Sequence, residues 1–271
     1  MSSHTSPAIE LRGTSKSFRT PSGNLHTAVR DLDLTVERGE FVAVVGPTGC
    51  GKSTTLTLVS GLEEPTEGEV LVAGEPVNGI GDKIGFVFQQ DAVFPWRTVL
   101  SNVMAGPRFR GVEKAEAKER AREWLARVGL SAFEDRYPHQ LSGGQRKRVA
   151  LAATFVNDPE LLLMDEPFSA LDVQTRALMS DELLDLWAGT GASVVFVTHD
   201  LEESIALADK VVVMTAGPAT VKEVFKIDLP RPRKVESVRL EPRFIEIYRE
   251  IWSSLGEEVR ITRERGATNA A

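Results

Sequence analysis

Hydrophobic and polar positions alternate in the first part of the chain and then give way to uninterrupted apolar runs. Residues 9–36 hold short alternating segments such as LDLTV (32–36), which predict half-buried antiparallel strands. From residue 41 onward the apolar runs are rich in β-branched residues and predict parallel strands that are buried on both faces. These runs are FVAVVG (41–46), IGFVF (84–88), ELLLMDE (160–166), SVVFVTHD (193–200) and KVVVM (210–214).

Helical segments separate most of these runs. Parallel strands then require right-handed β–α–β crossovers, which indicates an α/β fold with a mainly parallel sheet. Between IGFVF and ELLLMDE lie about 70 residues without a strand pattern, including KAEAKERAREWLARVGL (114–130). Apolar residues recur there at helical spacing, so we expect residues 90–140 to form a mainly helical subdomain inserted into the sheet domain. The helical positions are Ala117, Ala121, Trp124, Leu125 and Val128.

The C-terminal part begins with a proline-rich link, LPRPR (229–233), which interrupts regular structure. Apolar residues then trace one face of a helix, at Phe244, Ile247, Tyr248, Ile251 and Leu255. We therefore expect one α/β domain over residues 1–228, with an antiparallel β-subdomain near its N-terminus, followed by a linker and an amphipathic helix over residues 229–271.

Composition restricts the class of protein. The 271 residues are 42% hydrophobic and 26% charged, which is ordinary for a globular chain with room for one large α/β domain. The net charge of −7 disfavours non-specific nucleic-acid binding, which depends on Lys and Arg neutralising phosphates, although a local basic patch stays open. The single cysteine, Cys50, excludes an intrachain disulfide and fits a reducing compartment.

Targeting and membrane-spanning patterns do not stand out in this sequence. The N-terminal MSSHTSPAIELRG lacks a basic-then-apolar secretion pattern, and the longest apolar runs are far shorter than the roughly 20 residues that span a bilayer. We expect a cytosolic chain that is soluble when isolated, with any membrane role carried by a partner.

A glycine-rich turn follows the first apolar run and precedes a helical segment. Gly46, Gly51, Lys52 and Ser53 satisfy G-x-x-x-x-G-K-[ST] within FVAVVGPTGCGKSTTL. Glycines let backbone N–H groups converge on an anion, and the helix that follows adds partial positive charge. We expect Lys52 to reach the β- and γ-phosphates of a nucleotide and the Ser53 hydroxyl to ligate Mg²⁺. The alternatives are a flexible turn that binds nothing and a reactive, sensing role for Cys50.

Polar residues follow the other apolar runs at their carboxyl ends, where ligands of open α/β sheets bind. Asp165 ends LLLMD and is suited to hold Mg²⁺ through its water shell, and Glu166 beside it is placed to polarise an attacking water. Gln89 could reach the metal and the same water, and His199 could contact the γ-phosphate. The alternatives are acidic turn residues, a solvent-exposed glutamine and a histidine bonded to neighbouring backbone.

Taken in order, these motifs resemble those of the ATP-binding subunit of ABC transporters. The matching elements are GPTGCGKST, Gln89, LSGGQ (141–145), LLLMDE, SALD (169–172) and His199, over roughly residues 9–225. LSGGQ is the most specific of them, because a kinase or GTPase has no use for it. The resemblance implies a P-loop NTPase core, ATP and Mg²⁺ as cofactors, catalytic roles for Glu166, His199 and Gln89, and Ser53, Gln89 and Asp165 around the metal, partly through water.

The resemblance also implies that two copies of the chain share each ATP. The start of the LSGGQ helix in one copy contacts the γ-phosphate of the ATP bound by the other copy, and Asp172 contributes to the same dimer contact. Without the resemblance, Ser142 and Asp172 read as helix N-caps, and these alternatives stay open. The residues that act across the dimer are Ser142, Gly143, Gly144 and Gln145.

Phe18 corresponds in this resemblance to the aromatic residue that stacks on adenine, with core packing as its alternative. One residue and one segment depart from the family pattern, Lys147 where glutamine is frequent and ALAATF (150–155) where an Ala-Arg-Ala run is frequent. We expect these departures to alter dimer contacts rather than phosphate contacts. The residues expected to bind ATP directly in the same copy, besides Phe18, are Gly46, Pro47, Thr48, Gly49, Cys50, Gly51, Lys52, Ser53 and Thr54.

Two segments of the chain resemble those of ABC subunits that import nitrate, taurine, alkanesulfonates and related small compounds. They are FPWRTVLSNV, and VFKIDLPRPR followed by one amphipathic helix. The resemblance implies an ATPase coupled to transport, peripheral at the cytoplasmic face of the membrane, whose dimer closes on ATP and opens after hydrolysis. Its expected partners are a second copy, integral-membrane permease subunits and, indirectly, an extracytoplasmic solute-binding protein, with no nucleic acid. Phe94, Pro95 and Trp96 form an apolar loop suited to docking, with local packing as the alternative.

Two other functions stay open at this point. One is a soluble ABC-type ATPase that acts on ribosomes or nucleic acid. The other is an ATP-sensing scaffold that does not hydrolyse ATP, against which Glu166 and His199 argue.

Overall fold

The computed structural model describes residues 6–21 and 23–269, with side chains described up to Arg265. The described residues form two compact units. Unit 1 consists of the residues up to Gly81 together with those from Ser193 onward, and unit 2 consists of Asp82–Ala192.

An antiparallel sheet occupies the N-terminal part of unit 1. In the described residues it has four strands in the order β2-β1-β4-β5. In β2, Leu32, Leu34 and Val36 are buried and the residues between them are exposed, which confirms the predicted half-buried strand. The strands are β1 (Ile9–Arg19), β2 (Leu25–Val36), β4 (Glu67–Val72) and β5 (Glu75–Pro76).

Parallel strands form the centre of unit 1. Strand β3 (Phe41–Val45) pairs in parallel with β8 (Ser193–Val197) on one side and with β9 (Lys210–Met214) on the other. All residues of β3 and β8 are buried, as their uninterrupted apolar runs predict. Strand β10 (Val221–Lys226) continues this group antiparallel to β9.

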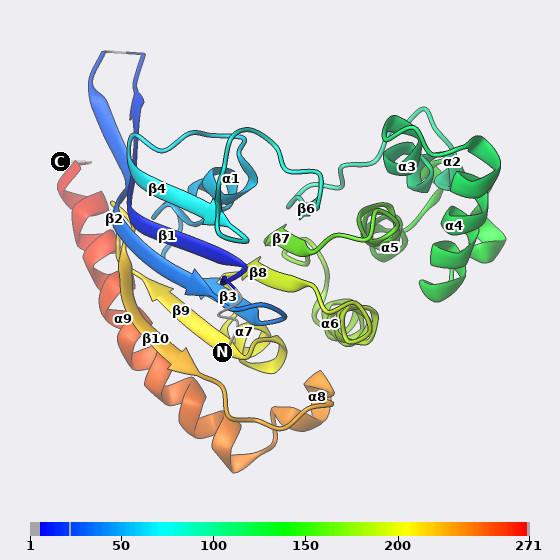
Figure 1. Cartoon of the computed structure of the whole chain (residues 1–271). Helices are drawn as coiled ribbons and strands as arrows, with labels where there is room; N and C mark the ends of the chain where they lie inside the picture. Colours follow the sequence, from blue (N-terminus) through cyan, green and yellow to red (C-terminus); the bar gives the residue numbers. More distant parts are fainter. Residues whose placement is uncertain (1–5, 22, 270–271) are drawn as a thin grey trace, which may run out of the picture. The chain divides into compact units, whose positions relative to one another are not determined.

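The helices of unit 1 are α1 (Lys52–Ser60), α7 (Leu201–Leu207), α8 (Val235–Val238) and α9 (Pro242–Asn269). Figure 1 shows α9 running along β10, and this helix contacts α7 and β9. Its buried side chains include four of the five that the periodicity singles out, Phe244, Ile247, Ile251 and Leu255. The fifth, Tyr248, is half-buried and stacks on the exposed Trp252.

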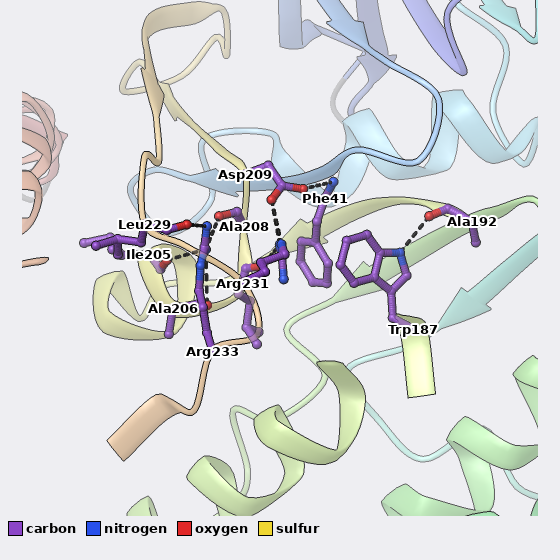
Figure 2. A network of polar contacts seen from close by, with 11 residues as sticks. Phe41, Trp187, Ala192, Ile205, Ala206, Ala208, Asp209, Leu229, Arg231 and Arg233 are labelled. Atoms are coloured by element: carbon purple, nitrogen blue, oxygen red, sulfur yellow. Dashed lines mark hydrogen bonds and ion pairs between the residues drawn. The ribbon is translucent and has the colours of Figure 1, made fainter. Parts of the chain in front are cut away.

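Two arginines fix the proline-rich link to the core of unit 1 (Figure 2). The Arg233 guanidinium donates to the carbonyl oxygens of Ala208 at 2.6 Å and Leu229 at 2.7 Å, just after α7 ends. Arg231 pairs with Asp209 at 2.8 Å, and the Asp209 carboxylate also accepts from the Phe41 N–H at 3.0 Å. Burial lowers the pKa of Arg233 to about 10. The link is therefore bonded in place between α7 and the start of β3.

Unit 2 combines a short parallel strand pair with helices. Strand β6 (Ile84–Val87) pairs in parallel with β7 (Leu161–Asp165). Trp124 stacks on Phe155 at 5.3 Å, and the Gly129 that follows α4 has a left-handed φ of 69°, as expected of a helix stop. The helices are α2 (Val99–Val103), α3 (Ala105–Phe109), α4 (Lys114–Arg127), α5 (Gly143–Phe155) and α6 (Val173–Trp187), with 3-10 turns η1 (Ser131–Phe133) and η2 (Pro138–Gln140).

These elements confirm the predicted fold class, an α/β chain with parallel strands, an antiparallel sheet near the N-terminus and a helical part. The predicted limits of the helical subdomain, 90–140, fall inside unit 2 and stay a prediction. Within residues 6–21 and 23–269, no helix is both long enough and apolar enough to pass through a bilayer.

Candidate functional site

The turn between β3 and α1, residues 46–51, is the segment predicted to bind phosphate, and it is called the phosphate loop from here on. Gly49 and Gly51 have left-handed backbones, with φ of 76° and 126°. A Cβ on Gly51 would lie 2.5 Å from the carbonyl oxygen of Ala28 and 2.9 Å from the Cβ of Ala219. Only glycine fits there, so this close approach of backbone to backbone requires the glycine that the motif supplies.

Helix α1 begins at Lys52 without a side-chain cap from Gly51 and without an acidic residue in its first turn. Its N-terminal N–H groups and their partial positive charge suit an anion in the loop. The buried Lys52 ammonium donates to the carbonyl oxygens of Gly46 at 2.9 Å and Pro47 at 3.0 Å. Phosphate oxygens are stronger acceptors for an ammonium than these carbonyls, so a bound triphosphate can exchange for them. Thr48, Gly49 and Ser53 are exposed around this lysine.

Cys50 is a buried residue of the loop, 3% exposed. Burial raises the pKa of its thiol, and the nearby Lys52 charge only partly opposes this. A protonated thiol is a poor nucleophile, so the arrangement disfavours the reactive, sensing alternative for Cys50.

His199 follows β8 at the same sheet edge as the phosphate loop. In the parallel β3–β8 pair, Val44 lies opposite Val197. The next backbone bond runs from the Thr198 N–H to the Val44 carbonyl at 3.2 Å. Gly46 and His199 each come two residues after the Val44–Val197 pair, and the His199 side chain is exposed. The register therefore places this histidine and the loop at one edge, as predicted from the sequence.

Phe18 lies near the end of β1 and is half-buried. The ammonium of Lys16 lies 5.1 Å from the centre of its ring and also pairs with Glu63 at 2.7 Å. One face of the ring thus carries a cation–π contact. Stacking of adenine on Phe18 stays a prediction.

Gln89 and Glu166 come together at the end of the β6–β7 pair in unit 2. Glu166 follows the half-buried Asp165, and the Gln89 amide nitrogen donates to the Glu166 carboxylate at 3.4 Å. Glu166 has a φ of 42°, a left-handed conformation that costs a glutamate on the order of 1–3 kcal/mol. Its carbonyl oxygen accepts from the Ser169 N–H at 3.2 Å and the Ser169 hydroxyl at 3.0 Å, which hold this conformation. Strain of this kind is typical of functional positions.

The LSGGQ segment starts helix α5. The Ser142 hydroxyl accepts from the Gln145 N–H at 3.3 Å, and the Gln145 side chain accepts from the Ser142 N–H at 2.9 Å, a capping box. Gly143 and Gly144 form the first turn, which has no acidic residue. A Cβ on Gly144 would lie 3.1 Å from the Thr175 methyl carbon. Ser142 is thus a helix N-cap, and its contact with a second copy's ATP stays a prediction.

Asp172 caps helix α6. Its carboxylate accepts from the Thr175 N–H at 3.0 Å and from the Thr175 hydroxyl at 2.7 Å. These bonds lower the pKa of Asp172. Capping accounts for an aspartate here, and the predicted dimer contact stays a prediction.

A charge cluster of Asp91, Arg146 and Lys147 joins α5 to the segment that carries Gln89. The buried Lys147 ammonium lies 3.0 Å from the Asp91 carboxylate and donates to the carbonyl oxygens of Gln89 at 3.3 Å and Phe88 at 3.4 Å. Arg146 donates to the other Asp91 oxygen at 3.2 Å. In the sequence, Lys147 is only a departure from the family pattern, and Asp91 is not among the predicted site residues. Two adjacent cations in the first turns of α5, with an acid two residues after Gln89, are the signal that could have found this cluster.

Comparison with known proteins decides what this set of motifs belongs to. The ABC transporter family matches residues 29–169. The chain is an ABC transporter ATP-binding subunit. The matched span contains the phosphate loop, Gln89, the LSGGQ segment, Asp165 and Glu166, and it leaves out Phe18, Asp172, His199 and α9.

Three relatives resemble this ABC subunit over most of its length. An uncharacterised ABC transporter ATP-binding protein of Methanocaldococcus jannaschii is 48% identical over 88% of this chain and 88% of its own. The aliphatic sulfonates import ATP-binding protein SsuB of Bacillus cereus is 38% identical over 84% of this chain and 90% of its own. The taurine import ATP-binding protein TauB of Shigella sonnei is 40% identical over 85% of this chain and 92% of its own.

A solved structure resembles the subunit as well. A bacterial ABC transporter cassette, solved as a dimer, superposes with a TM-score of 0.73 at 33% identity, covering 82% of this chain and 100% of the cassette. The same cassette has been solved bound to ADP and phosphate after hydrolysis. The ABC subunit therefore has the P-loop NTPase fold and binds ATP, and its family implies ATP hydrolysis.

The predicted magnesium ligands of the ABC subunit are all oxygen donors, namely a serine hydroxyl, a glutamine amide and one carboxylate. In the described part of the chain, no group of three or more His, Cys, Asp or Glu residues is arranged to hold a metal ion. A small number of protein ligands is enough for Mg²⁺, because the ion keeps several waters and binds through one or two carboxylates together with substrate phosphates. The side chains of Ser53, Gln89 and Asp165 fit that pattern by their chemistry, and their binding of one Mg²⁺ stays a prediction.

Proposed function

We propose that this ABC subunit is the ATP-hydrolysing part of an importer for a small anionic or zwitterionic solute of the sulfonate, taurine or nitrate kind. The observation that carries the proposal is the identity of 38% and 40% to relatives named for the import of aliphatic sulfonates and taurine, over 84% and 85% of this chain. The subunit would work at the cytoplasmic face of the membrane, beneath separate permease subunits that receive the solute from an extracytoplasmic binding protein.

In the proposed reaction, the phosphate loop and Lys52 bind the β- and γ-phosphates. Ser53, Gln89 and Asp165 would hold Mg²⁺, partly through water, and the ion would neutralise charge on the phosphates. Glu166 polarises the attacking water. The hydrogen bond that its carboxylate accepts from the Gln89 amide orients Glu166 for this role. His199 contacts the γ-phosphate from the β8 edge.

A second copy completes each site in this proposal. The start of α5 contacts the ATP held by the other copy, through Ser142, Gly143, Gly144 and Gln145. The N–H groups of this first helical turn have no acceptor within the helix, so they are available to an anion. Asp172 adds to the dimer contact. The dimeric state of the solved cassette supports this arrangement.

The permease would dock on an aromatic surface of unit 2 that consists of the loop before α2 and the end of α3. Trp96 and Phe109 are each 72% exposed, and Arg97 lies over the rings of Phe94 at 4.7 Å and Phe109 at 5.6 Å. The buried Asn102 holds the loop, accepting from the Phe94 N–H at 2.6 Å. An exposed aromatic group on a fixed loop favours docking over local packing as the role of this segment.

The decisive experiment is to reconstitute the subunit with its co-expressed permease subunits and binding protein in proteoliposomes, after finding the binding protein's ligand by thermal shift. The proposal predicts ATP-dependent uptake of a sulfonate-like or nitrate-like solute that stops with Glu166→Gln. ATP turnover that ignores the permease and rises with RNA or ribosomes would instead support the soluble alternative.

A further inference from the structure

The far end of α9 reaches the turn between β9 and β10 in unit 1. One oxygen of the Glu258 carboxylate accepts from the Ala216 N–H at 2.7 Å. The Arg265 guanidinium donates to the carbonyl oxygens of Ala216 at 2.7 Å and Gly217 at 2.6 Å. Two side chains of the same helix therefore bond the N–H and the carbonyl oxygen of Ala216.

The turn lies directly against the phosphate loop. A Cβ on Gly217 would lie 3.6 Å from the Cys50 carbonyl oxygen and 3.7 Å from the Cys50 Cα. On either side of Gly217, a Cβ on Gly46 would lie 3.3 Å from the Met214 carbonyl oxygen, and a Cβ on Gly51 would lie 2.9 Å from the Cβ of Ala219. The segment from Met214 to Ala219 thus lies against the first residue of the loop, Gly46, and against its last two, Cys50 and Gly51.

The Glu258 carboxylate is a buried anchor rather than a surface contact. The residue is 6% exposed, and its second oxygen pairs with Lys222 at 2.9 Å. A buried carboxylate with one oxygen on a backbone N–H and the other on a cation is satisfied in this place and costly to move. Burial raises the pKa of Cys50 in the loop, and the negative charge of Glu258 makes a smaller contribution in the same direction.

We propose that Glu258 and Arg265 are positioning residues for the phosphate loop. Through the β9–β10 turn they hold residues 46–51 in the shape that accepts a triphosphate, so that nucleotide affinity depends on the C-terminal helix. The inference rests on the proposed nucleotide contacts of this loop. It assigns a role to α9, which lies outside the span of the family match.

The test compares two variants with two matched controls. Arg265→Ala and Glu258→Gln loosen the turn, whereas Arg263→Ala and Glu257→Gln remove the same charges from α9 at exposed positions that do not bond to the turn. Glu257→Gln also controls for the altered charge near Lys222, because Glu257 pairs with that lysine at 2.6 Å. ATP affinity is measured with a fluorescent nucleotide at a temperature where circular dichroism shows all variants folded.

The loss of charge-assisted hydrogen bonds to the turn should raise the Kd for ATP by about three- to tenfold in Arg265→Ala, less in Glu258→Gln, and not in the controls. KM for ATP should rise with it, while kcat at saturating ATP changes little, because no reacting group is touched. Cys50, the single cysteine, gives a second readout, since its maleimide labelling should speed up when the loop loosens.

An unchanged Kd and an unchanged Cys50 labelling rate in folded Arg265→Ala and Glu258→Gln would overturn the inference, even if their melting temperatures fall. Equal effects in the controls would overturn it too, because they would indicate general charge effects of α9. If the loop did not bind the nucleotide, the wild-type chain and Lys52→Ala would bind ATP equally. If the subunit did not drive an importer, solute uptake would fail while the Kd differences among the α9 variants remained.

Discussion

The phosphate loop and the charge cluster beside Gln89 hold site residues in place by different means. The loop relies on backbone geometry, because Gly51 sits where a side chain would collide with Ala28. The Gln89 segment relies on side-chain charge, because Lys147 bonds its carbonyl oxygens and pairs with Asp91. Substitutions that add a side chain should therefore impair the phosphate loop, whereas substitutions that remove charge should impair the Gln89 segment.

The largest effect is expected on the chemical step, at Glu166, which accepts a hydrogen bond from Gln89 next to the charge cluster. Glu166→Gln should keep ATP binding and lower kcat by about 10²–10⁴-fold, because a general base is lost while the phosphate contacts remain. Steady-state phosphate release and nucleotide binding measure the two quantities separately. Undiminished hydrolysis would show that another group polarises the water.

The next effect separates two glycines of the phosphate loop. Gly51→Ala should lower the free energy of unfolding by about 2–4 kcal/mol and weaken ATP binding, because strain at φ 126° adds to a backbone collision. Gly49→Ala is the matched control, since no atom lies within 4 Å of its Cβ position and only about 1 kcal/mol of backbone strain is expected. Urea denaturation of both variants gives the comparison, and equal losses would remove the steric argument.

A smaller effect is expected from the charge cluster. Lys147→Met should lower kcat about tenfold and leave the Kd for ATP within about twofold, because Gln89 loses its support while the phosphate loop is untouched. Lys147→Gln keeps one donor and should fall between Lys147→Met and the wild type. Arg148→Met is the control, as Arg148 lies on the same helix and pairs with Glu182 instead. A change in Kd without a change in kcat would place Lys147 outside the catalytic geometry.

The sequence allowed the elements and the loop to be predicted because their signals are local. Uninterrupted apolar runs identified β3 and β8, and the glycine spacing identified the loop before Lys52. The pairing of Lys147 with Asp91 could not be read, because 56 positions separate the two residues and nothing local predicts their approach. The contact of α9 with the β9–β10 turn could not be predicted for the same reason.

Some site features depend on geometry that a one-dimensional pattern cannot carry. The left-handed backbone of Glu166 and the cation over Phe18 appear only in three dimensions. For Ser142 and Asp172, the sequence left capping and dimer contact as alternatives, and both residues cap their helices. Capping and contact with a second copy are compatible, since a capped helix start still presents backbone N–H groups.

We expect ATP to join two copies of the subunit, because the Lys52 loop of one copy holds the nucleotide and the Ser142 helix start of the other copy contacts it. Light scattering after size exclusion of Glu166→Gln, with and without Mg-ATP, tests it most directly. We expect a shift from monomer to dimer on adding ATP, and we expect the Ser142→Glu substitution to abolish this shift. A Glu166→Gln protein that binds ATP and stays monomeric at every concentration would contradict it.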